Sequence, residues 1–173
     1  MTTARRKRKQ YRPGVAAAAV LAAAYTGVAS VLATALPAAP AAATERIVVD
    51  WHTGLAIGGY DPVAFFTDGK PIAGRADLEL RHAGTIWRFA NIGNRAAFAA
   101  RPDVYMPQYG GYDPLGVARG VAVAGNPFMW LIADDRLYLF YSAIRRDAFA
   151  AKPMRAIDMA NRKWPDVERA LTP

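Results

Sequence analysis

The chain contains no cysteine, which excludes disulfide bonds, thiolate nucleophiles and thiolate metal ligands. Histidine is nearly as scarce: His52 and His82 lie far apart and lack the short spacing of a transition-metal site. Ser30 and Ser142 are the only serines, and no nucleophile-elbow, metalloprotease or phosphate-loop motif occurs. These absences predict a protein that is not an enzyme.

Acidic residues are missing from residues 1–43, which hold six of the 22 Lys and Arg residues. The net charge of +8 therefore belongs mostly to this leader, because residues 44–173 carry all 14 acidic side chains beside the other 16 basic ones. Both signs are interspersed there, which argues against a nucleic-acid partner. A basic start followed by an apolar run is instead typical of a targeting segment.

Residues 15–36 contain no charge and ten alanines, and a Pro- and Ala-rich stretch follows them. Two interpretations follow. One is a secretory signal peptide cleaved between Ala43 and Thr44, after an A-x-A end. The other is an uncleaved anchor, because 22 uncharged helical residues are long enough to span a bilayer. Either way we expect export, with residues 44–173 periplasmic or held outside the cytoplasm on the inner membrane.

The exported part repeats itself. Residues 58–62 (Gly-Gly-Tyr-Asp-Pro) recur as residues 110–114, and residues 84–102 align with residues 135–153. Phe98 of the first copy matches Phe149 of the second. Self-similarity at a fixed offset predicts two copies of one supersecondary unit, residues 58–102 and 110–153.

Each copy is predicted to contain a short helix, a hairpin and a longer helix. Asp61 and Asp113 precede prolines, which suggests an N-cap followed by proline at the first helical position. Alternating apolar and polar residues predict a hairpin over 78–89 and a more continuously apolar, more buried one over 128–141. A last helix is expected from about 154 to 164. The fold class is α+β, with Trp51, Trp87, Trp130 and Trp164 expected as core or core-rim anchors.

These motifs resemble the YHS domain proteins of bacterial envelopes over about residues 47–168. The resemblance is carried by residues 59–66, 87–89, 94–98 and 107–112 and by Trp164 with Pro165. It implies an exported domain related to metal-associated YHS and TRASH-like modules, in which a cysteine often follows the Gly-Gly-Tyr run. Here Asp113 occupies that position, so a hard carboxylate replaces a soft thiolate.

The candidate binding residues cluster around the two Gly-Gly-Tyr-Asp turns. They are Tyr60, Asp61, Tyr105, Tyr109, Gly110, Gly111, Tyr112 and Asp113. Glycines allow the backbone to approach a ligand and tyrosines can line its pocket. The competing interpretation is a turn with its tyrosines in the core, their hydroxyls bonded to backbone and the aspartates acting as caps.

Two functions remain open from the sequence. The first is a non-enzymatic envelope domain that binds a small ligand or a protein partner, with no cofactor, and that reaches the membrane through the leader if this is uncleaved. The alternative is a metal-handling protein in which Asp113 and nearby tyrosines supply oxygen ligands, with His52 as a further weak candidate.

Overall fold

The computed structural model describes residues 45–171. The predicted leader and its cleavage site, within residues 1–44, lie outside this range. The first repeat contains η1 (Ile57–Gly59), α1 (Ala64–Thr67), β1 (Arg75–His82), β2 (Thr85–Phe89), α2 (Ile92–Ala100) and α3 (Pro102–Tyr105). The second contains η2 (Gln108–Gly111), α4 (Pro114–Val117), β3 (Asn126–Ala133), β4 (Arg136–Phe140), α5 (Ala143–Ala151) and α6 (Pro153–Arg169). The predicted α+β fold of two hairpin-plus-helix units and a C-terminal helix is confirmed.

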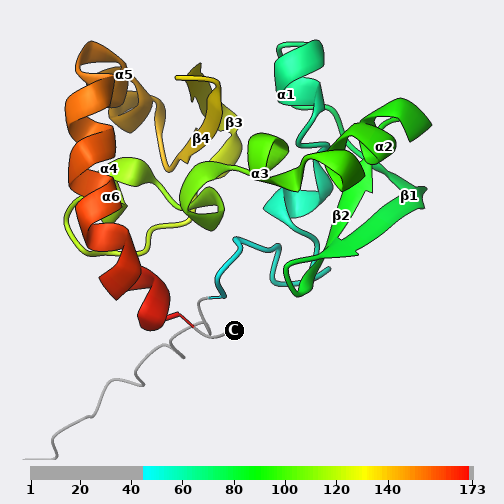
Figure 1. The fold of residues 1–173 in the computed structure, drawn as a ribbon, viewed down its shortest axis with the longest axis horizontal. Helices are drawn as coiled ribbons and strands as arrows, with labels where there is room; N and C mark the ends of the chain where they lie inside the picture. Colours follow the sequence, from blue (N-terminus) through cyan, green and yellow to red (C-terminus); the bar gives the residue numbers. More distant parts are fainter. Residues whose placement is uncertain (1–44, 172–173) are drawn as a thin grey trace, which may run out of the picture. The chain divides into compact units, whose positions relative to one another are not determined.

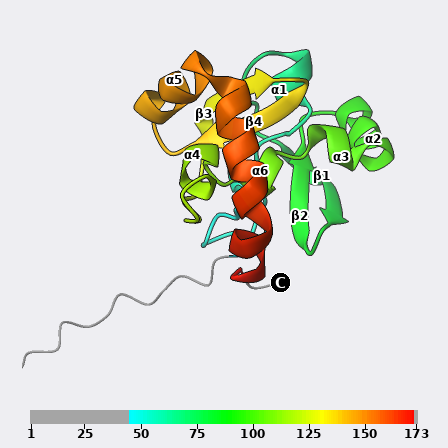
Figure 2. The same ribbon diagram turned by 60° about the vertical axis from the view of Figure 1, so that its left-hand side comes forward.

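Two separate two-stranded antiparallel sheets form, one in each repeat. Figures 1 and 2 show α2 beside the β1–β2 hairpin and α5 and α6 with the β3–β4 hairpin. The hairpins turn at Ala83-Gly84 and at Asp134-Asp135, inside the two predicted hairpin ranges. All four turn residues have positive φ, which suits the right-handed twist of a two-residue hairpin loop.

The repeats agree in detail as well as in order. The register of β1 shifts between Arg75 and Glu79, and that of β3 shifts at the matching positions, Asn126 and Trp130. The helices α2 and α5 both begin after a residue at φ −150° and end at one with φ near −140° to −150° and ψ near 60°. A proline then starts the next helix in each copy. The same local sequence therefore folds the same way twice.

Apolar side chains gather in two cores, one centred on each repeat. The first core contains Phe65, Trp87, Phe89 and Phe98, and the second contains Tyr138, Phe140, Phe149 and Ile157. Phe98 and Phe149 are both fully buried on helices, at matching positions. These side chains dominate the hydrophobic stabilisation, since fully burying one large apolar side chain contributes about 1.5–3 kcal/mol.

Strand β4 belongs to both cores. Leu137 and Leu139 pack into the first core, while Tyr138 and Phe140 point to the opposite face and pack into the second. A strand with both faces buried needs apolar residues at successive positions rather than at alternate ones. The burial of both faces of β4 thus explains the continuous apolar run of the second hairpin.

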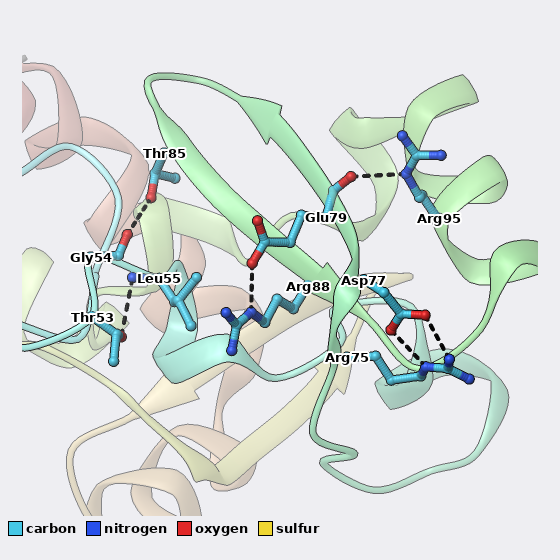
Figure 3. Close-up of polar contacts among 9 residues, drawn as sticks. All are labelled: Thr53, Gly54, Leu55, Arg75, Asp77, Glu79, Thr85, Arg88 and Arg95. Atoms are coloured by element: carbon cyan, nitrogen blue, oxygen red, sulfur yellow. Dashed lines mark hydrogen bonds and ion pairs between the residues drawn. The ribbon is translucent and has the colours of Figure 1, made fainter.

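The β1–β2 hairpin keeps one polar face. Arg88 on β2 donates to the Glu79 carboxylate on β1 (2.8 Å), and Arg95 of α2 reaches the backbone carbonyl of Glu79 (2.9 Å), as Figure 3 shows. The position of Arg88 corresponds to that of the buried Leu139, so the two hairpins differ in burial on this face.

Two sequence predictions, one about the last helix and one about the tryptophans, are wrong. The last helix does not end near Trp164 but continues through Pro165 to Arg169. Pro165 cannot donate a backbone hydrogen bond, yet Val167 and Leu171 beyond it are buried, and this burial keeps the chain helical. Trp51 is not a core anchor: it is 82% exposed and stacks on His52 in a tight loop whose backbone is held by Asp50. Within residues 45–171, no helix is long and apolar enough to cross a membrane.

Candidate ligand-binding site

The two Gly-Gly-Tyr-Asp turns are backbone motifs under strain. Ile57 has φ 44° and Tyr109, at the matching position, has φ 55°. A β-branched or bulky residue seldom adopts positive φ, and such strain persists only where surrounding contacts impose it. Since both copies show it, the turn itself requires this conformation, and a ligand is not needed to explain it.

Asp61 is a fully buried carboxylate that ties three segments of the first repeat together. Its Oδ1 accepts from the Val63 amide (2.8 Å), and its Oδ2 accepts from the Ala90 amide (2.8 Å) and the Asn94 side chain (2.7 Å). The turn is thereby linked to the end of β2 and the start of α2. Helix α1 begins only at Ala64, so Asp61 holds the turn before the helix and is not its N-cap.

Asp113 repeats this arrangement in the second copy. It caps α4 as predicted, because its Oδ1 accepts from the amides of Leu115 (2.8 Å) and Gly116 (3.1 Å). Its Oδ2 accepts from the Tyr141 amide (3.0 Å), as Asp61 does from Ala90. The third partner differs: the Arg145 guanidinium binds both carboxylate oxygens, at 2.6 Å and 3.2 Å, where the first repeat has the neutral amide of Asn94.

This environment leaves Asp113 poorly suited to hold a metal. Both of its oxygens already accept hydrogen bonds, and Arg145 supplies the positive charge that a cation would otherwise bring. His52 lies exposed on the Trp51 loop. Across residues 45–171 no three His, Asp or Glu side chains are grouped so that they could hold a metal ion.

The four candidate tyrosines fall in different places. Tyr60 packs edge-on against Phe128, and Tyr105 packs edge-on against Phe66. Tyr112 is buried and donates its hydroxyl hydrogen to the backbone carbonyl of Glu45, as the core interpretation expects. Tyr109 differs from the others because it lines a pocket.

The pocket has a volume of about 570 Å³, within the range of small-molecule sites. It lies where four segments converge: the start of the described chain, the β1–β2 turn, the stretch from α3 to η2, and α6. Its lining consists of residues 45–47, 83–85 and 106–110 with Asp103, Trp164 and Glu168. Of the candidate residues, Tyr109 and Gly110 are in this lining; Tyr60, Asp61, Tyr105, Gly111, Tyr112 and Asp113 are not.

Gly110 shapes one wall of the pocket. Its φ is 62°, and its carbonyl accepts from the Val48 amide at 2.8 Å. A Cβ added there would lie 1.9 Å from the carbonyl oxygen of Arg46. Only glycine therefore lets residues 46–48 pack against the turn, and this packing brings Glu45 and Arg46 to the pocket.

The aromatic wall of the pocket consists of Tyr109 and Trp164, whose ring centroids are 5.5 Å apart. The Tyr109 hydroxyl donates to Asn161 Oδ1 of α6 at 2.8 Å. Burial, followed by the nearby Tyr138 and Asp158, holds the pKa of Tyr109 far above its usual value, and burial raises the pKa of Tyr112 to about 12. Both side chains stay neutral at physiological pH, which disfavours them as phenolate metal ligands.

The charged groups of the pocket are mostly acidic. Glu45, Asp103 and Glu168 face one basic residue, Arg46. The Asp103 carboxylate lies 3.9 Å from the guanidinium of the exposed Arg101, which partly neutralises it. Most of the net negative charge of the pocket therefore comes from Glu45 and Glu168. Sequence reasoning did not single out these acidic residues, and it treated Trp164 only as a core anchor. No local pattern connects residue 45 with residue 168; only the tertiary fold brings them together.

No protein-family model, curated protein or solved structure matches this chain. The resemblance to YHS domain proteins therefore stays a prediction that rests on the motifs of this chain.

Proposed function

We propose that this chain is an exported, non-enzymatic binding domain of YHS type whose pocket takes a small organic cation. The pocket beside Tyr109 is the observation that supports binding, because it combines a suitable volume with an aromatic wall and convergent polar groups. Its charge supports the ligand class. Glu45 and Glu168 attract a cation, and the indole face of Trp164 is the best aromatic partner for one.

The test is a calorimetric titration of the purified full chain with choline as a probe cation. Choline should bind, and its neutral isostere 3,3-dimethylbutanol should bind at least ~10-fold more weakly, because it lacks the charge that the carboxylates and the indole attract. Glu168→Gln should weaken choline binding several-fold, and Trp164→Leu should weaken it further.

The control is Asp135→Asn, which removes an acidic group outside the pocket. Asparagine tolerates the positive φ of 53° at this turn position, so the variant should fold normally. This variant should bind choline like the unchanged protein. Equal binding of choline and its neutral isostere, or an equal loss in Asp135→Asn and Glu168→Gln, would contradict the proposed ligand class.

Export is tested separately. A reporter enzyme that is active only outside the cytoplasm, fused after Pro173, should be active, because the basic and apolar leader directs the chain across the membrane. The same fusion without residues 1–43 is the matched control and should be inactive. Activity from a reporter that works only in the cytoplasm would exclude export.

A further inference from the structure

The ligand pocket contains a charge that a simple cation does not use. Besides Glu45, Asp103 and Glu168, its lining includes the exposed Arg46. Within residues 45–171, Arg46 forms no ion pair with any of these acidic side chains. An arginine that served only to neutralise the pocket carboxylates would pair with one of them. The guanidinium of Arg46 is therefore available to a ligand.

The backbone that carries Glu45 and Arg46 is held in place on both sides. The Tyr112 hydroxyl donates to the Glu45 carbonyl, and the Tyr112 ring centroid lies 6.5 Å from that of Trp164. The Val48 amide donates to the Gly110 carbonyl at 2.8 Å, where the chain packs against the second Gly-Gly-Tyr-Asp turn. One carboxylate and one guanidinium thus project from a fixed stretch of the pocket wall, and a backbone that is already ordered lowers the entropic cost of binding.

The pocket is also larger than a single ammonium group needs. Its volume of about 570 Å³ leaves room for a ligand with two separate charged ends. Gln108, another lining residue, has a carboxamide that can donate hydrogen bonds to an anionic group. Opposite charges in the wall therefore match opposite charges within one ligand.

We propose that the ligand is a zwitterion that carries a carboxylate as well as an ammonium group, which is the chemistry of betaines and amino acids. This inference rests on the proposed cation site. The ammonium group lies against Trp164 and Glu168, and the carboxylate accepts hydrogen bonds from Arg46, which can donate two in parallel. A free carboxylate is repelled by Glu45 and Glu168, so a carboxylate gains from the pocket only when it is joined to an ammonium group.

The test is a calorimetric titration of the purified full chain with three matched probes. Choline supplies the trimethylammonium group alone. Glycine betaine carries the same group with a carboxylate, and 3,3-dimethylbutanoate keeps that carboxylate but has carbon in place of the charged nitrogen. Glycine betaine should bind at least ~5-fold more tightly than choline, because it adds the contact with Arg46, and 3,3-dimethylbutanoate should bind most weakly.

Variants of Arg46 test which residue reads the carboxylate. Arg46→Gln should bring the affinity for glycine betaine to within ~2-fold of that for choline, without weakening choline binding, and Arg46→Glu should make choline the tighter ligand. Both variants should fold, since the turn at Gly110 packs against the backbone of residue 46 and the side chain is exposed. Arg119→Gln is the matched control: it removes an exposed arginine that does not line the pocket, and it should keep the preference for glycine betaine.

The inference fails, while the cation site stands, if choline binds and glycine betaine binds no more tightly, or if Arg46→Gln leaves the preference for glycine betaine unchanged. Tighter binding of 1,4-diaminobutane than of glycine betaine would also overturn it, because the pocket would then respond to its net negative charge alone. Equal binding of choline and 3,3-dimethylbutanol overturns the proposed function and this inference together, so the two failures are distinguishable.

Discussion

Replacing Asp113 with alanine is expected to lower the free energy of unfolding by about 3 kcal/mol. The change removes the cap of α4, leaves the Tyr141 amide without its acceptor and strips Arg145, 22% exposed at its side chain, of its counter-charge. Loss of a cap costs about 0.5–2 kcal/mol, and an uncompensated, partly buried charge adds to this.

Asp113→Asn separates the cap from the charge. Sequence reasoning expects little effect, because asparagine is a good N-cap. The structure changes this expectation to a loss of about 2 kcal/mol, since the carboxamide lacks the negative charge and would point its NH₂ group at hydrogen-bond donors.

Arg145→Asn is the matched control. It recreates the partner that Asp61 has in the first repeat, where Asn94 donates to the carboxylate. We expect a cost below about 1 kcal/mol, because a neutral donor replaces a charged one at a position where the fold already accepts it once. The measurement is denaturant unfolding, with and without divalent metal. Stabilisation of the unchanged protein by metal, absent from both Asp113 variants, would contradict the structural role and favour metal binding.

Replacing Gly110 with alanine is expected to cost at least about 3 kcal/mol and to abolish ligand binding. The added Cβ would lie 1.9 Å from the Arg46 carbonyl oxygen, so residues 46–48 would have to leave the turn. This movement breaks the hydrogen bond from Val48 and removes Glu45 and Arg46 from the pocket. Both thermal unfolding and choline titration should report the change.

Gly58→Ala is the control for this prediction. Gly58 occupies the matching place in the first repeat with φ 65°, but the nearest atoms to an added Cβ belong to the Tyr60 ring, at 3.7 Å. This variant carries the same left-handed backbone strain, about 1–2 kcal/mol, without a clash against backbone. Equal destabilisation by the two substitutions would show that strain alone, and not close packing of residues 46–48, requires glycine at position 110.

Much of the fold was predictable because its signals are local. Alternation over residues 78–89 specifies a hairpin with one buried face, and a turn residue or proline next to each periodic stretch marks where an element starts or stops. Residues 58–62 recur as residues 110–114, so a structure inferred for one copy is also expected in the other. Both observed turns, at Ala83 and Asp134, lie inside the predicted hairpin ranges.

Predictions failed where the type of a single residue was taken as decisive and other contacts outweighed it. Pro165 is a sound reason to end a helix, but burial of Val167 and Leu171 outweighs the lost hydrogen bond. Trp51 is apolar enough to be expected inside, yet the loop held by Asp50 turns it to solvent. The contacts that bury Val167 and Leu171 are distant in sequence, whereas the loop around Trp51 is held by local hydrogen bonds from His52 and Thr53 to Asp50.

The amino-acid order was sufficient for the α+β class and the two repeated units, because these depend on contacts within a few residues or on direct repetition. It also suggested N-caps at Asp61 and Asp113, and the structure confirms only the second. Only the tertiary structure decided that β4 serves two cores, that Arg145 neutralises Asp113, and that Glu45 meets Glu168 beside Trp164. These features join segments that no periodicity relates. Each feature forms because the burial of apolar side chains elsewhere in the domain brings two distant chain segments together.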